Sequence, residues 1–239
     1  MPLYYYHFDW TYLYIVLPCI LLSLWASSNV NSTFKRYSQQ FSRRGLTGAE
    51  AARRVLSANG VSGVRIDRVS GKLTDHYDPR SNVIRLSDDV YSSTSVAAIG
   101  VACHEAGHAV QYARDYFPIK LRAAIIPITN LGSKIAMPLI LLGILFSGLG
   151  RHSYTLVYLG IACFSLSLVF QLVTLPVEFD ASHRALVSIQ QGDLLSDEEY
   201  RGARKTLTAA ALTYVAATAV SLAQILRLLI LFGPRRDDD

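Results

Sequence analysis

The chain has 239 residues, of which 51% are hydrophobic, and its mean hydropathy is positive. This composition is typical of a membrane protein and argues against a chain built only from soluble domains. The formal net charge is +5 at pH 7, but the basic residues gather beside an apolar segment without interleaved aromatic residues, so we expect no nucleic-acid partner.

Four segments are apolar and long enough to cross about 30 Å of hydrocarbon, which takes roughly 20 helical residues. The first covers residues 8–28, and interfacial aromatic residues are expected near its ends, where the sequence has Trp10, Tyr12, Tyr14 and Trp25. It lacks a basic stretch before the apolar run, so we predict a retained anchor and not a cleaved signal peptide. The second and third form a hairpin over residues 133–176, with a turn at residues 151–153, and the fourth covers residues 209–232.

The positions of basic residues predict how these helices are oriented. No lysine or arginine precedes the first span, whereas six follow it: Lys35, Arg36, Arg43, Arg44, Arg53 and Arg54. Short loops rich in lysine and arginine stay in the cytoplasm, so we expect the N-terminus outside and residues 29–130 and 177–208 inside. The terminal RRDDD would then lie outside, where its two arginines run against the rule.

The polar region after the first span contains signals for helices and strands. Thr47 followed by Glu50 is a capping box that predicts a helix within residues 46–60. The segments VRIDRVS and NVIRLSDDVY alternate apolar and polar residues, which predicts two strands joined through the turn-rich DHYDPRSN. A longer helix is expected over residues 95–113.

Residues 104–108 read HEAGH. Residues four apart share one face of a helix, so His104 and His108 could bind one zinc ion at about 2.0–2.1 Å through neutral ring nitrogens. Glu105 would lean toward the open coordination position, where it could accept a proton from water. Gly107 costs about 1 kcal/mol in a helix interior and would let another element pass closely. The alternative is an ordinary amphipathic helix with two histidines.

A catalytic zinc ion normally has three protein ligands and a water molecule, so a third ligand must come from elsewhere in the chain. Positions 111 and 114 are glutamine and arginine, which excludes the HExxHxxGxxH arrangement. The next candidate segment is LPVEFDASHRAL, residues 175–186, which the predicted topology places on the same side of the membrane.

Three residues of this segment are candidate ligands. Pro176 suits a helix start and would place Glu178 in the first turn, where the helix dipole favours a carboxylate. Asp180 lies about 200° around that helix from Glu178 but shares a face with His183. The third ligand is therefore Glu178, or one of the pair Asp180 and His183.

Four segments in order, GVACHEAGHAVQYA, LTDHYDPRSNVIRLSDDVY, QLVTLPVEFDASHRAL and AAALTYVAA, resemble the YugP-type family of bacterial membrane zinc-dependent peptidases over most of the chain. The wider comparison is with the CAAX-prenyl-protease and HtpX group, in which an E-x-x-A-D segment supplies the third ligand. The resemblance implies that Glu178 is the ligand and that Ala181 matches the alanine. Ser182 stands in the place of the aspartate, whose carboxylate commonly orients a ligating histidine.

Together, the residues and the resemblance predict a mainly α membrane protein. About four transmembrane helices would accompany a small α+β zincin-like cytoplasmic domain that carries the HExxH helix. The expected organisation is a first transmembrane helix at 8–28, a catalytic region at 29–130, a transmembrane hairpin at 133–176, a segment with the third ligand at 177–208 and a fourth transmembrane helix at 209–232.

The expected activity is that of a zinc metallopeptidase of the bacterial cell membrane. One zinc ion per chain would be held by His104, His108 and Glu178, with Glu105 as the general base. The site would face the cytoplasm just above the membrane surface, where it would act on peptides and on unfolded or membrane-proximal protein segments.

Further roles follow from the same resemblance. In those peptidases a strand before the zinc helix pairs with extended substrate, which points to residues 82–87: Asn82, Val83, Ile84, Arg85, Leu86 and Ser87. The alternative is an interior strand. His76, Tyr77 and Tyr214 are candidate donors to the oxyanion of the reaction, although the first two also suit a turn for local reasons.

Other functions fit the sequence less well. In a non-catalytic scaffold or binding protein stabilised by zinc, the metal would need a fourth protein ligand and Glu105 would have no use. Cleavage within the bilayer would need HEAGH inside an apolar span, but Gln111, Arg114 and Asp115 follow it closely. Transport is disfavoured because the spans carry few polar residues near their middle.

Overall fold

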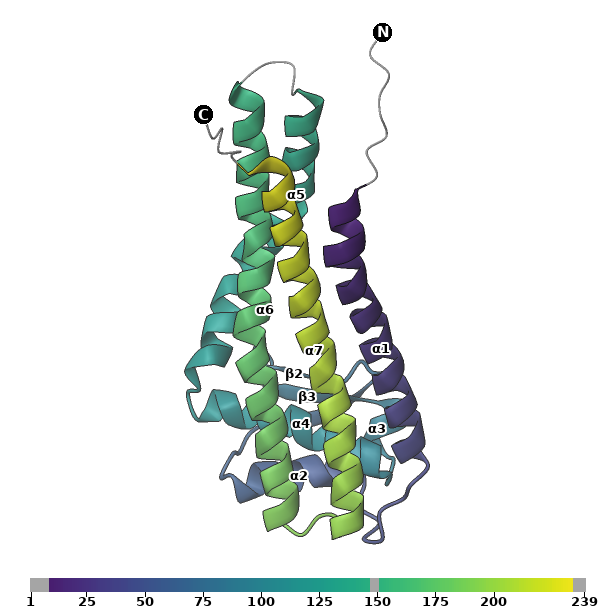
Figure 1. Cartoon of the computed structure of the whole chain (residues 1–239). Coiled ribbons are helices and arrows are strands. Elements are labelled where there is room, and N and C mark those ends of the chain that lie inside the picture. Colours follow the sequence, from purple (N-terminus) through teal and green to yellow (C-terminus); the bar gives the residue numbers. More distant parts are fainter. Residues whose placement is uncertain (1–8, 147–150, 234–239) are drawn as a thin grey trace. The chain divides into compact units, whose positions relative to one another are not determined.

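The structure is a computed structural model that describes residues 9–146 and 151–233 (Figure 1). It is mainly helical, with one small sheet, as the sequence predicts. The elements in chain order are η1 (Tyr12–Val16), α1 (Leu17–Ser38), α2 (Gly48–Ala58), β1 (Arg65–Val69), β2 (His76–Asp78), β3 (Val83–Ser87), α3 (Asp88–Tyr91), α4 (Val96–Ala113), α5 (Phe117–Leu145), α6 (Arg151–Gln191) and α7 (Asp197–Phe232).

Four helices are long and apolar enough to cross a membrane, which confirms the number predicted. They are α5, α6, α7 and the continuous helix formed by η1 and α1. All four extend well beyond the predicted spans: the first continues to Ser38, and α5 begins at Phe117. Helix α6 continues through Pro176 to Gln191, and α7 begins at Asp197, twelve residues before the predicted span. A hydropathy pattern detects only the apolar part of such a helix, because the polar turns that extend it do not look like a membrane segment.

Two local predictions in this part of the chain are wrong. Pro176 lies inside α6 and does not begin a helix, so Glu178 is not in a first turn. Residues 151–153, the predicted turn of the hairpin, are the first residues of α6. The segment between α5 and α6, residues 147–150, and the terminal RRDDD lie outside the described residues.

The chain divides into two compact units, and the four long helices contribute residues to both. The first unit comprises residues 1–25, 125–172 and 215–239. Within it, Arg227 of α7 donates from Nε to Asp9 Oδ2 at 2.8 Å and lies over the Tyr12 ring at 5.3 Å. Helices α5 and α6 pack closely, since a Cβ at Gly160 would lie 2.9 Å from the carbonyl oxygen of Ala136.

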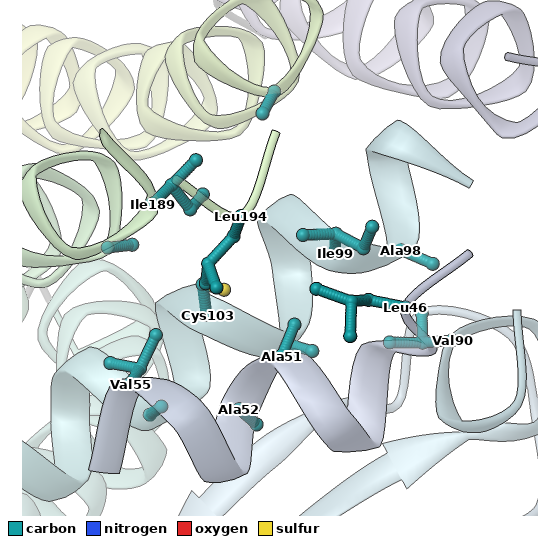
Figure 2. Packing of buried hydrophobic residues seen from close by; sticks show 14 of the residues in the cluster. Leu46, Ala51, Ala52, Val55, Val90, Ala98, Ile99, Cys103, Ile189 and Leu194 are labelled. Carbon is teal, nitrogen blue, oxygen red and sulfur yellow. The ribbon is translucent and has the colours of Figure 1, made fainter. Parts of the chain in front are cut away.

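The second unit comprises residues 26–124 and 173–214 and contains the main hydrophobic core. Ala51 and Val55 of α2 pack there with Ile99 and Cys103 of α4 and with Ile189 of α6 (Figure 2). The predicted capping box of α2 is confirmed: Glu50 N donates to Thr47 Oγ1 at 3.2 Å, and Thr47 N donates to Glu50 Oε2 at 2.8 Å.

The sheet has the strand order β1-β3-β2, in which β1 runs parallel to β3 and β2 runs antiparallel to it. The first predicted strand is present as β1, but only the first half of NVIRLSDDVY is a strand, β3, because its last four residues form helix α3. The segment DHYDP, expected as a turn, contains β2. His76 and Tyr77 are therefore strand residues. Their pairing with Arg85 and Ile84 of β3 is a long-range contact that local turn signals do not reveal.

The position of β3 bears on the predicted pairing with substrate. β3 is the middle strand, and Val83, Ile84 and Arg85 face β1 on one side and β2 on the other. Val83, Ile84 and Arg85 thus have no free edge, and the alternative of an interior strand describes these three residues, whereas Leu86 and Ser87 pair with β1 alone among the described strands. The open edges of the sheet belong to β1 and β2.

Candidate metal centre

Helix α4 carries the HEAGH residues through the core of the second unit. Its start is fixed by Ser95, whose hydroxyl accepts a hydrogen bond from Ala98 N at 3.2 Å. His104 and His108 lie one turn apart on one face, with ring centroids 4.7 Å apart. The predicted helix and the shared face of the two histidines are thus present.

The third member of the site comes from α6. Glu178 Oε2 lies 3.3 Å from His104 Nε2 and 3.6 Å from His108 Nε2. These three residues form a group whose ligand atoms lie within 4.8 Å of one another. Asp180, one of the alternatives, instead accepts from Gln111 Nε2 at 2.8 Å and from Arg184 Nε at 2.6 Å. The fold therefore brings Glu178 to the two histidines.

The donor set fits a zinc ion. Two ligand atoms bound tetrahedrally at about 2.0–2.1 Å lie roughly 3.4 Å apart, close to the separations between Glu178 Oε2 and the two imidazole nitrogens. Oε2 is buried and has no hydrogen-bond partner among the described residues. Because a buried carboxylate oxygen is costly when nothing pairs with it, a cation shared with the imidazoles would stabilise this arrangement.

The electrostatics of the site also favour a cation. Burial by itself would lower the pKa of His108, but the nearby carboxylates of Glu178 and Glu105 outweigh it, so this pKa is raised. The same negative charges would attract a metal ion to the imidazole nitrogens. Glu105 is itself only 8% exposed, which places the predicted general base in the buried part of the site.

Small residues allow α4 and α6 to approach closely enough to form the site. A Cβ at Gly107 would lie 2.6 Å from the carbonyl oxygen of Ala181, so any larger residue there would push the helices apart. The close approach predicted for Gly107 is confirmed. Ala181 is fully buried, and it lies between Glu178 and Ser182, which both face the histidines.

Hydrogen bonds on the far side of each imidazole hold the rings in place. His104 Nδ1 lies 3.1 Å from Ser182 Oγ, and His108 Nδ1 lies 2.9 Å from Gln111 Oε1. The amide of Gln111 is held in turn, because Nε2 donates to the carbonyl oxygen of Val177 at 2.8 Å. A proton on each Nδ1 leaves Nε2 of both rings available to a metal.

Ser182 thus occupies the place of the expected aspartate and still contacts His104. We expect Ser182→Ala to lower zinc affinity by about 10–100-fold, the usual cost of losing an outer partner of a ligating histidine. Ser182→Asp, which introduces a carboxylate that could accept a hydrogen bond from His104 Nδ1, should bind zinc at least as tightly as the wild type. Competition with a chromophoric chelator measures both affinities, and an unchanged affinity in the alanine variant would contradict a positioning role for Ser182.

Two further residues contact Glu178. Arg122 of α5 donates from Nη1 to Glu178 Oε1 at 3.0 Å, which engages one carboxylate oxygen and leaves the other toward the histidines. Tyr214 of α7 interacts electrostatically with Glu178 and Glu105. Of the three predicted oxyanion donors, Tyr214 is the one that the structure brings to the metal group.

The other two predicted donors have partners elsewhere in the second unit. His76 is exposed, and its Nδ1 lies 2.7 Å from the carbonyl oxygen of Thr74. Tyr77 donates from its hydroxyl to Asn82 Oδ1 at 2.8 Å, and its ring lies 5.6 Å from that of Tyr112 on α4. Within the described residues, neither belongs to the group that could hold a metal.

The chain resembles known proteins over nearly its whole length. The family described as "putative neutral zinc metallopeptidase" matches residues 12–233. The chain is also similar to "Putative membrane protease YugP" of Bacillus subtilis (strain 168), with 45% identity over 228 residues that cover 95% of this chain and 99% of that protein. No solved structure gives a significant match. The matched range includes both helices that bring the candidate ligands together.

Proposed function

The chain belongs to the neutral zinc metallopeptidase family, and we propose that it is a membrane-embedded endopeptidase with one zinc ion held by His104, His108 and Glu178. The observation that carries this proposal is the buried Glu178 Oε2, which has no hydrogen-bond partner among the described residues yet lies 3.3 and 3.6 Å from two imidazole nitrogens. Among the residues that the structure describes, the group contains three protein ligands and no fourth, as expected for a catalytic and not a structural zinc site.

The proposed mechanism assigns a separate task to each residue around the site. Zinc would supply Lewis-acid polarisation of the peptide carbonyl and a lowered pKa for water. Glu105 would accept the proton of the attacking water and return it to the leaving amine. Tyr214 would donate a hydrogen bond to the developing oxyanion. Ser182 and Gln111 would orient the two imidazoles, and Arg122 would hold Glu178 in position.

We further propose that the protein crosses the bacterial cell membrane several times and that its active site faces the cytoplasm. Four helices have the required length and apolar character. The basic residues that follow the first of them, within residues 35–54, favour the cytoplasmic side for the segments that carry His104 and Glu178. Substrates would then be peptides and unfolded or membrane-proximal protein segments.

An extended substrate would pair with an edge strand of the sheet. We assign this role to β2 in place of the predicted β3, because β2 is an edge strand and lies next to α4 through the contact of Tyr77 with Tyr112. Pairing with backbone groups would hold a peptide without demanding a particular sequence. This would suit a peptidase that acts on unfolded segments of many proteins.

Metal removal tests the proposed function directly. The full chain purified in detergent should contain about one zinc ion per molecule and should hydrolyse casein. Hydrolysis should stop after treatment with a chelator and return when zinc is added back. Zinc content is measured by elemental analysis, and hydrolysis by release of labelled peptides. A protein that retains zinc but never cleaves would instead support the scaffold alternative.

A further inference from the structure

A groove of about 530 Å³ lies between α1 and α7 in the second unit, away from the metal group. We call it the basic groove because four of its lining residues are cationic: Arg36 of α1, and Arg201, Arg204 and Lys205 of α7. Two hydroxyl side chains, Thr33 and Thr208, also line it. All of these could donate hydrogen bonds to an anion.

The two helices that form the groove are in direct contact. A Cβ at Gly202 would lie 2.7 Å from the ring of Tyr37, a buried residue of α1. The absence of a side chain at position 202 therefore lets α7 approach α1 closely. The residues on either side of this contact, Arg201 and Arg204, are placed beside Arg36 by the packing of the helices and not by sequence proximity.

The four cations of the basic groove form no ion pair with a carboxylate in the part of the chain that the structure describes. Other arginines of the second unit do, such as Arg122 with Glu178 and Arg184 with Asp180. Within the described ranges, Arg201 donates only to the carbonyl oxygen of Asp197, at 3.4 Å, and Arg36 lies over the Tyr37 ring at 5.7 Å. Four like charges around one hollow repel each other, and an anion bound among them would relieve this repulsion.

The groove lies where polar and apolar parts of its helices meet. The apolar run of α7 begins at Ala209, directly after Thr208, and Ala209 and Leu212 line the apolar end of the same groove. At about 1.5 Å of rise per residue, Lys205 lies roughly 6 Å before this run. This distance is comparable to the depth of the headgroup region, which adds roughly 5–8 Å to each side of the hydrocarbon core.

We propose that the basic groove binds the phosphate headgroup of an anionic phospholipid. The inference rests on the membrane location proposed above and is independent of the metal site. Basic pockets between helices at the membrane surface are suited to such headgroups. A role in orientation alone needs only basic residues somewhere in the loop. It does not explain why cations from two distant segments surround one hollow without acidic partners.

Native mass spectrometry of the full chain in detergent tests this proposal, with phosphatidylglycerol and phosphatidylcholine as probes. We expect phosphatidylglycerol to be retained in preference to phosphatidylcholine. Each cation lost should weaken phosphatidylglycerol binding by roughly 5-fold, so the double variant Arg204→Gln/Lys205→Gln should weaken it by about 30-fold. Arg36→Gln alone should weaken it by about 5-fold. The matched control Arg53→Gln/Arg54→Gln removes the same charge from exposed positions on α2 and should have little effect.

Three results would overturn the proposal: equal losses in the two double variants, equal retention of the two lipids, or binding of inorganic phosphate as tight as that of phosphatidylglycerol. The first would reflect net charge alone, and the last would assign the groove to a free anion. A parallel experiment tests the proposed membrane location by itself: cell membranes are isolated and washed at alkaline pH. A protein that spans the membrane stays in the membrane fraction, whereas release into the soluble fraction would contradict the membrane location and not the lipid site.

Discussion

Replacement of Glu105 by glutamine should lower kcat/KM for peptide hydrolysis by about 10²–10⁴-fold, the usual contribution of a general base. Glutamine has nearly the same shape as glutamate but cannot accept a proton from water at neutral pH. Glu105 is not part of the group that could hold the metal, so the zinc content of the variant should equal that of the wild type. Casein hydrolysis and elemental analysis on one preparation measure both quantities.

A second glutamate provides the control for this experiment. Glu198 lies on α7 with its side chain 74% exposed, and its contact with Arg43 is a surface ion pair at 3.8 Å. Glu198→Gln removes the same charge, but such exposed pairs contribute little, so activity should be unchanged. Hydrolysis by Glu105→Gln at the wild-type rate would exclude Glu105 as the base. Loss of zinc from this variant would instead show that Glu105 holds the metal.

Much of the second unit could be predicted because its signals are local. Thr47 and Glu50 lie three residues apart and specify the start of α2 through their own hydrogen bonds. The pairing of His104 with His108 requires only the geometry of one helix. Gly107 was expected at a close helix contact, and the structure places the backbone of Ala181 against it. In each case the information lies within one or two helical turns.

Features that depend on distant contacts could not be predicted in the same way. The strand β2 exists because His76–Asp78 pair with β3, and a three-residue strand flanked by turn-forming residues carries no clear pattern of its own. Arg122 reaches Glu178 across 56 positions of sequence, so no local signal indicates their contact. Gln111 could have been found, because it follows His108 by three residues and therefore lies on the same face of α4.

The continuity of α6 explains why Glu178 could be chosen only with the help of a resemblance. The sequence suggested a helix that begins at Pro176, whereas Pro176 is an interior residue and the helix runs unbroken to Gln191. The angular argument survives this correction, since it depends only on helical periodicity. Glu178 faces the histidines, Asp180 contacts Gln111 and Arg184, and His183 is exposed.

Replacement of Glu178 by glutamine should reduce zinc affinity by more than the roughly 10–100-fold expected for loss of an outer partner, because it removes a charged ligand itself. The amide oxygen of glutamine can still accept the hydrogen bond from Arg122, so the contact between α5 and α6 should be kept. Hydrolysis at limiting zinc should fall in parallel with occupancy and recover partly when zinc is in large excess. Titration against a chromophoric chelator gives the affinity.

His183→Ala is the matched control, because His183 was the other kind of ligand that the sequence allowed and its side chain is exposed. This variant should bind zinc and hydrolyse casein as the wild type does. The opposite pattern, with zinc lost from His183→Ala and retained by Glu178→Gln, would mean that α6 presents a different face to α4. The close approach of Ala181 to Gly107 determines which face of α6 meets α4. We therefore expect Gly107→Ala to separate Glu178 from the histidines and to weaken zinc binding. If α6 presented a different face, Gly107→Ala would leave zinc binding intact.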